Sequence, residues 1–183
     1  MNKLSIVVFS LIFIFCACNS SDQQGSSADY ESNTPKGQAS VVDDESAKNI
    51  LQIAAGSKDH TTLVAAVQAA GIEHILVNAG PLTVFAPNNA AFEALPAGTV
   101  ETLLKPENKS KLAFILTNHA SPSTFKGRLL KDGMKMYMAT GVYVDVKREG
   151  DDVWVGGAKI LGTVDASNGV VHVVDKVIVP PEK

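Results

Sequence analysis

The chain has 183 residues, of which 45% are hydrophobic, and its formal net charge is −3 at pH 7. That length corresponds to roughly one domain of ordinary size. Residues 45–183 carry 14 acidic and 14 basic side chains, and this neutral balance argues against a nucleic-acid partner and against a strongly cationic ligand.

The N-terminal segment Met1–Cys18 is typical of an export signal. Lys3 provides a basic start, and Leu4–Phe15 is almost wholly apolar. In a helix, such a short run extends about 18 Å, well short of the roughly 30 Å hydrocarbon core of a bilayer. The segment therefore predicts a signal peptide and not a membrane-spanning anchor.

The end of this segment, Phe15-Cys16-Ala17-Cys18, resembles a bacterial lipobox. The small residue Ala17 precedes Cys18, which makes Cys18 the predicted site of lipidation and of attachment to a membrane. A simple cleaved signal with two incidental cysteines is the alternative. Both cysteines of the chain lie here, so the sequence predicts no disulfide and no thiolate metal site in the mature domain.

Residues 19–44 differ from the segments on either side. They are rich in Ser, Gln, Asn and Asp, contain few large apolar side chains and carry a net charge of −4. Such a segment buries too little apolar surface to offset the entropy lost on ordering. We expect a disordered polar tether whose span, as a flexible coil, is roughly 30 Å.

Residues 45–118 show helical spacing of apolar side chains, interrupted by one short strand. Leu63, Val67 and Ala70 share one face of a predicted helix that Gly71 ends. Asn88 or Asn89 is the predicted N-cap of a later helix. We expect helices over Ser46–Ala55, Thr61–Ala70, Asn88–Leu95 (with Phe92 and Leu95 inward), Thr99–Leu104 and Pro106–Asn118 (burying Leu112, Phe114, Ile115 and Leu116), and a buried strand over Leu82–Ala86.

After Pro122 the apolar period changes to two, which is typical of strands. Residues 149–152, Glu-Gly-Asp-Asp, predict a hairpin turn. We expect strands over Lys135–Thr140, Val142–Arg148, Val153–Gly156, Lys159–Val164 and Val170–Val179. Helices followed by strands indicate the α+β class, in contrast to alternating βαβ units.

Three segments resemble, in order, the motifs of the fasciclin domain family. They read GPLTVFAPNNAAFEAL at residues 80–95, LTNHASP at residues 116–122 and NGVVHVVDKVIVP at residues 168–180. The resemblance implies a single fasciclin-like domain over residues 45–183. Its fold would be a β-wedge of two packed sheets, with several helices from the N-terminal half wrapped around it.

The outer two motifs have structural readings. Pro87 turns the chain sharply after a core strand, and Asn168-Gly169 is a tight turn that opens a strand buried on both faces. His172 lies in that strand and is expected to be neutral and hydrogen-bonded, with a ligand or catalytic role as the alternative. The predicted structural positions are Thr83, Phe85, Pro87, Phe92, Asn168, Gly169, His172 and Asp175.

In some animal members of the family, adhesion maps to an Asp-Ile pair before the last motif and to a Tyr-His pair in the central motif. Here Asp165 is followed by Ala166, and His119 is preceded by Asn118. Each pair is half present, which weakens any transfer of receptor binding. These four residues are the candidate interaction positions, and the alternative for His119 is a structural histidine at a helix end.

The sequence contains no recognisable catalytic motif. Its four histidines do not pair at metal-ligand spacing, and we predict no catalytic residue, no metal and no cofactor. Met134, Met136 and Met138 alternate, which suits either an adaptable apolar sheet face or, as the alternative, a Cu(I) site. Among Met136, Tyr137, Met138, Tyr143 and Trp154, the outward-facing members are the best candidates for a contact surface.

The fasciclin resemblance and the lipobox together imply a non-enzymatic, membrane-anchored binding or adhesion module outside the cytoplasm. It would be a lipoprotein of the cell membrane or outer membrane facing the periplasm or the cell surface, with a protein, matrix or glycan partner. The alternative is a small-molecule carrier, or an accessory enzyme of an envelope or polymer-processing system. An apolar pocket with convergent polar groups would favour the alternative, and a filled interior with a broad patch would favour adhesion.

Overall fold

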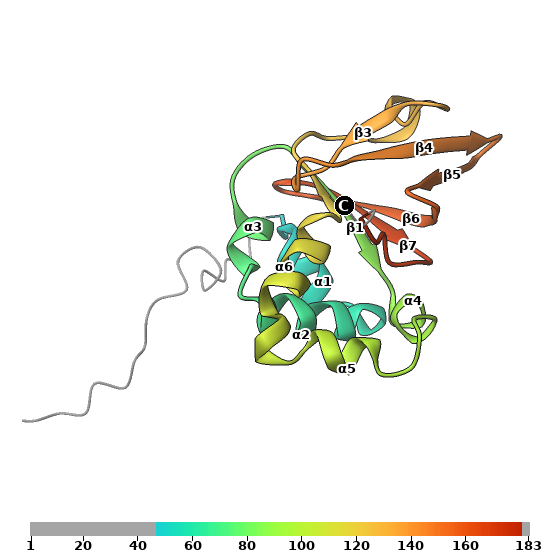
Figure 1. The fold of residues 1–183 in the computed structure, drawn as a ribbon. Coiled ribbons are helices and arrows are strands. Elements are labelled where there is room, and N and C mark those ends of the chain that lie inside the picture. Colours follow the sequence, from blue (N-terminus) through green and yellow to red (C-terminus); the bar gives the residue numbers. More distant parts are fainter. Residues whose placement is uncertain (1–46, 181–183) are drawn as a thin grey trace, which may run out of the picture. The chain divides into compact units, whose positions relative to one another are not determined.

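The computed structural model describes residues 47–180. The predicted signal peptide, Cys18 and the tether at residues 19–44 lie outside the described residues. Figure 1 shows the helices of the N-terminal half on one side of this region and most strands on the other. The elements are α1 (Ile50–Ala55), η2 (Lys58–His60), α2 (Thr61–Ala70), α3 (Glu73–Val77), β1 (Leu82–Pro87), α4 (Asn89–Glu93), α5 (Thr99–Leu103), η3 (Pro106–Asn108), α6 (Lys109–Thr117), β2 (Ala120–Ser121), η4 (Gly127–Leu129), β3 (Lys135–Tyr137), β4 (Tyr143–Glu149), β5 (Asp152–Val155), β6 (Ala158–Ala166) and β7 (Gly169–Val174).

Local sequence explains most helix ends. Helix α1 starts later than predicted because Asn49 caps it, accepting from the Gln52 backbone N–H while the Gln52 side chain accepts from Asn49 N–H. Helix α2 has the predicted bounds, and Gly71 ends it in the left-handed conformation at φ 70°. Asn88 caps α4 by accepting from the Ala91 N–H at 2.9 Å.

The predicted helix over Pro106–Asn118 is divided into η3 and α6. Leu112 and Leu116 are buried, but Phe114 is 44% exposed, so its predicted burial was wrong. Phe114 is two residues from each of these leucines, which places it on the opposite side of the helix. Helix α3 and strand β2 were not predicted, because each is short and lacks a sustained apolar period.

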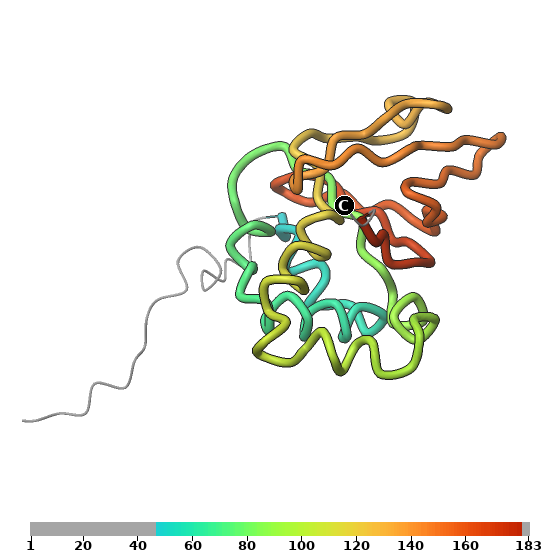
Figure 2. Tube along the Cα trace, in the orientation of Figure 1, coloured from blue at the N-terminus to red at the C-terminus, as the bar shows by residue number. Residues whose placement is uncertain are grey.

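The strands form one sheet in the order β2-β1-β7-β6-β5-β4-β3. The pair β1–β7 is parallel and the other pairs are antiparallel, and Figure 2 shows the green β1 segment lying within the red and orange half. The two end strands approach each other, because Ala139 N–H donates to the Ala120 carbonyl and Ser121 Oγ donates to the Tyr137 carbonyl, each at 2.7 Å. The sheet therefore curls until it is nearly closed.

Two apolar cores lie on opposite sides of β1 and β7. On β1, Val84 and Ala86 enter one core and Phe85 the other, as the alternation of strand side chains requires. The helix-side core consists of Ile50, Leu63, Ala66, Val67, Ala70, Ile72, Leu76, Val84, Ala86, Phe92, Leu112, Leu116, Ala120 and Val171. The strand-side core consists of Phe85, Leu130, Met136, Met138, Val144, Val146, Val153, Val155, Ala158, Val174 and Ile178.

This arrangement confirms the predicted α+β class and the fasciclin-like wedge. The two packed sheets are here two parts of one curled sheet, since Phe85 of β1 packs with Met136 of β3 and Val144 of β4. Helices from the N-terminal half cover the other side of β1 and β7 (Figure 1).

The turn before β7 is held by one side chain. Asn168 Oδ1 accepts from the Ile50 N–H at 3.0 Å, and Asn168 Nδ2 donates to the Leu76 carbonyl at 2.8 Å. A Cβ on the following Gly169 would collide with the backbone of Leu82. The Asn-Gly pair therefore joins α1, α3 and β1 to the start of β7 at a separation that no larger residue allows.

Candidate functional site

Asn118, a candidate interaction position, lies at the end of α6 and is completely buried. Its Oδ1 accepts from Thr140 Oγ1 at 2.7 Å, and its Nδ2 donates to the Ile178 carbonyl at 3.3 Å. Both polar groups of the side chain therefore form hydrogen bonds inside the fold. It presents no atom to a partner in this structure.

His119 is buried beside it, with 2% of its surface exposed. Its Nε2 lies 2.8 Å from the backbone N of Ile178, and because that N–H is a donor, Nε2 is the acceptor. Its Nδ1 therefore carries the proton and donates to the Ile115 carbonyl at 2.8 Å. Burial lowers the pKa of His119 to about 4, although the Ile115 carbonyl opposes the shift, so the ring is neutral at pH 7.

We call Asn118, His119 and their partners Thr140 and Ile178 the His119 seam. It ties the end of α6 to the loop after β3 and to the segment after β7. The His119 carbonyl also accepts from Phe85 N–H of β1 at 2.8 Å. The seam thus connects four parts of the chain that lie far apart in sequence.

The other predicted pair lies elsewhere. Asp165 on β6 is exposed and forms an ion pair with Lys126 at 2.6 Å, and Ala166 is partly buried against the helix-side core. Asp165 is the exposed member of the four candidates, so the structure does not gather them into one surface. Their role in an interaction stays a prediction.

His172 on β7 is buried and uses both ring nitrogens. Because Nε2 faces the Phe125 carbonyl at 2.7 Å, it is the donor, and Nδ1 accepts from Thr163 Oγ1 at 2.8 Å. Its ring stacks on Phe85 with centroids 5.4 Å apart. Burial lowers its pKa, with a smaller lowering from Lys126 and an opposing effect of the Phe125 carbonyl. This neutral ring joins the sheet to the loop before η4.

The remaining motif residues are buried or partly buried. Thr83 Oγ1 donates to the Ser123 carbonyl at 2.6 Å and accepts from the Phe125 N–H at 2.8 Å. Asp175 Oδ1 accepts from the Lys159 N–H at 2.7 Å, just after β7. Pro87 ends β1, and Phe92 of α4 is buried in the helix-side core.

The three methionines in and next to β3 belong to the core or pack against it. Met136 and Met138 are fully buried in the strand-side core, and Met134 packs against it. Their thioethers fill space among aliphatic side chains, a common use of methionine. Within residues 47–180 no group of three or more His, Cys, Asp or Glu side chains is placed to hold a metal ion.

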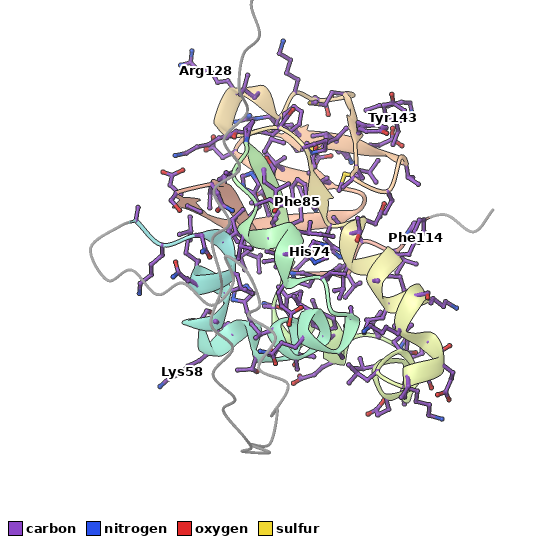
Figure 3. The ribbon with its side chains drawn as sticks, turned by 90° about the vertical axis from the view of Figure 1, so that its left-hand side faces the viewer. Lys58, His74, Phe85, Phe114, Arg128 and Tyr143 are labelled. Carbon is purple, nitrogen blue, oxygen red and sulfur yellow. The ribbon has the colours of Figure 1, made fainter. Side chains whose placement is uncertain are left out.

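The outer surface of β3 and β4 carries two exposed tyrosines. Tyr137 is 47% exposed and Tyr143 is 61% exposed, and their ring centroids lie 5.3 Å apart at an interplanar angle of 60°. The adjacent cross-strand pair is the ion pair between Lys135 and Asp145, at 2.8 Å. We call these four residues the tyrosine face. Figure 3 shows Tyr143 at the periphery and Phe85 inside the fold.

His60 occupies a buried position that the sequence analysis did not predict. It ends η2 and is 6% exposed, and its Nε2 is buried without a hydrogen-bond partner among the described residues. A signal was present, because residue 60 continues the buried stripe of Leu63, Val67 and Ala70 toward the N-terminus. A histidine at an apolar stripe position marks a buried polar group that needs a partner.

None of the helices within residues 47–180 combines the length and the apolar content needed to span a bilayer.

Comparison with known proteins shows which domain family the chain resembles. A sequence model described as the Fasciclin domain matches residues 58–180. Protein sll1483 of Synechocystis sp. is 45% identical over 155 residues, covering 84% of this chain and 86% of that protein. Immunogenic protein MPB70 of Mycobacterium bovis is 34% identical over 164 residues, covering 84% of this chain and 80% of that protein.

A solved structure shares the fold. It is a FAS1 domain pair from the insect cell adhesion molecule fasciclin I, and it superposes with a TM-score of 0.62 at 14% sequence identity. The match covers 72% of this chain and 51% of that chain.

Proposed function

Given that the chain belongs to the Fasciclin domain family, we propose that it is an exported, non-enzymatic binding or adhesion module. Lipidation at Cys18 would hold it on a membrane, and the partner would be a protein, matrix material or a glycan. The structural neighbour from fasciclin I is described as part of a cell adhesion molecule, which supports this class of function.

The tyrosine face carries the proposal. Tyr137 and Tyr143 project from the adjacent strands β3 and β4, where they form a cross-strand pair. Tyrosine is enriched at protein interfaces because a rigid apolar ring ends in a hydroxyl that donates and accepts. The ion pair of Lys135 and Asp145 beside the rings supplies the polar rim typical of a contact surface.

The buried histidines support a non-enzymatic role. His119 and His172 each engage both ring nitrogens in hydrogen bonds within the fold. A general acid or base must reach its substrate with a free nitrogen. These two rings instead connect parts of the chain, so the proposal assigns them to stability.

The test is an adhesion assay with the full-length protein on the surface of its own cells, deleted for the chromosomal copy. The variant Tyr137→Ala/Tyr143→Ala removes both rings, and Leu129→Ala is the matched control, because Leu129 is 55% exposed on η4, outside the tyrosine face. Loss of an anchor cluster of this kind weakens binding on the order of tenfold or more. We expect this loss for the double variant and wild-type adhesion for the control.

A second experiment tests the anchor. Cys18→Ala should release the chain from the membrane fraction, because the acyl chains would be lost. Unchanged membrane partitioning would contradict the lipoprotein assignment.

The alternative function of a small-molecule carrier is favoured by one observation, the cavity beside His60.

A further inference from the structure

A cavity of about 180 Å³ lies between the end of α1 with η2 on one side and strands β1, β6 and β7 on the other. It is lined by Ile53, Ala54, Ser57, Asp59, His60, Ala86, Val164, Val171 and Val173. Most of these side chains are apolar. We call this set the His60 corner.

His60 is the polar group of the His60 corner that lacks a complete set of partners. Its Nδ1 lies 2.8 Å from Ser57 Oγ, while no atom of the described residues meets hydrogen-bond geometry at Nε2. The Ala86 carbonyl lies near enough to favour the protonated ring, and Asp59 acts in the same direction, but burial outweighs both and lowers the pKa of His60. A neutral imidazole whose Nε2 has no partner at hydrogen-bond geometry among the described residues therefore lines a mostly apolar cavity.

The surroundings select the charge and polarity of a ligand. Ser57 Oγ either donates to or accepts from Nδ1, so Nε2 is available as an acceptor or as a donor. A hydroxyl group serves both cases. Asp59 lines the same cavity, and its carboxylate disfavours an anionic ligand. A neutral molecule with one hydroxyl group therefore matches the site.

The size and openness of the cavity select the rest of the ligand. An engineered apolar cavity of about 150 Å³ in another protein holds benzene, so a volume of about 180 Å³ accommodates one six-membered ring with a substituent. Val164, one of the lining residues, is 43% exposed, so the cavity lies close to the surface. Figure 3 shows the adjacent Lys58 pointing away from the fold, and its ammonium group does not line the cavity.

We propose that the His60 corner binds a small neutral molecule with a single apolar ring and one hydroxyl group, and that the hydroxyl hydrogen-bonds to His60 Nε2. This site is separate from the tyrosine face and does not depend on an adhesive role. The ligand class is that of simple phenols and cyclic alcohols.

The test uses 4-fluorophenol as the probe with the purified full-length chain, followed by ¹⁹F NMR. Fluorobenzene, which lacks the hydroxyl, and 4-fluorobenzoate, which is anionic, are the matched ligands. We expect 4-fluorophenol to bind at least about tenfold more tightly than either, since one hydrogen bond to a buried nitrogen corresponds to that factor. Equal binding of fluorobenzene and 4-fluorophenol would overturn the proposal, as would absence of binding by the wild-type chain.

Two further readouts locate the site. In the wild-type chain the ¹⁵N resonances of the His60 ring should shift on addition of 4-fluorophenol, while those of His119 and His172 should not. His60→Phe should abolish binding, and His74→Phe, on the exposed α3 position, should leave it unchanged. A shift at His119, or full binding by His60→Phe, would contradict the assignment. Loss of adhesion in the tyrosine double variant with unchanged 4-fluorophenol binding would show that the two sites are independent.

Discussion

The His119 seam and the His60 corner both bury a histidine beside the helix-side core, but they differ in how the ring nitrogens are hydrogen-bonded. At the seam each ring nitrogen meets a backbone group, at 2.8 Å in both cases. At the corner one nitrogen lies 2.8 Å from Ser57 Oγ, and the other has no partner at hydrogen-bond geometry among the described residues. A buried polar atom with a partner stabilises a fold, whereas one without a partner costs stability unless something else supplies the bond. His119 is therefore a structural histidine, whereas His60 is a candidate ligand site.

The largest expected effect is at the seam. His119→Phe keeps a ring of similar size but removes the acceptor of Ile178 N–H and the donor to the Ile115 carbonyl. A buried N–H left without a partner costs about 1–3 kcal/mol, and the second lost bond adds to it. We expect the free energy of unfolding in urea to fall by about 3 kcal/mol. A loss below about 1 kcal/mol would mean that the seam is not structural.

Acidification should produce an effect of similar size in the wild-type chain. The pKa of His119 is about 4 in the folded state against an ordinary 6.5, so between these values the unfolded chain binds the extra proton. Stability from this group is therefore complete above about pH 6.5 and falls as the pH drops toward 4, by about 3 kcal/mol. The lowered pKa values of His60 and His172 act in the same direction.

The measurement is the free energy of unfolding in urea at several pH values from 7 to 4. Since other groups also titrate, the contribution of His119 is the difference between the wild-type chain and His119→Phe at each pH. That difference should shrink as the pH falls. Parallel pH profiles for the two proteins would contradict the assignment of Nε2 as the acceptor from Ile178.

The matched substitution at the corner should have the opposite sign. His60→Phe removes the nitrogen that lacks a partner and places apolar atoms against a cavity of about 180 Å³. We expect the free energy of unfolding to rise by about 1 kcal/mol, measured in the same urea titration. Destabilisation as large as that of His119→Phe would show that Nε2 already has a partner, and the contrast between the two regions would fail.

Sequence patterns predicted the helices and strands better than the two histidine sites. The bounds of α2, the strand β1 and the α+β class follow from apolar periods and stop signals that act within about ten residues. The acceptor role of His119 depends on Ile178, which is 59 residues away in sequence. No local sequence pattern indicates that these two residues are in contact. His60 was visible only as a polar residue on an apolar stripe, and its cavity depends on β6 and β7, far along the chain.

The smallest expected effect on stability is at the tyrosine face. Tyr143→Ala removes a ring that is 61% exposed and pairs mainly with Tyr137 across the strands, at 5.3 Å. An exposed cross-strand pair contributes roughly 0.2–1 kcal/mol, so the free energy of unfolding should fall by about 0.5 kcal/mol. If Tyr143→Ala instead destabilised the chain as much as His119→Phe, the ring would be structural. A small change in urea unfolding together with lost adhesion would separate contact from stability, because the histidines that hold the fold together are buried away from this face.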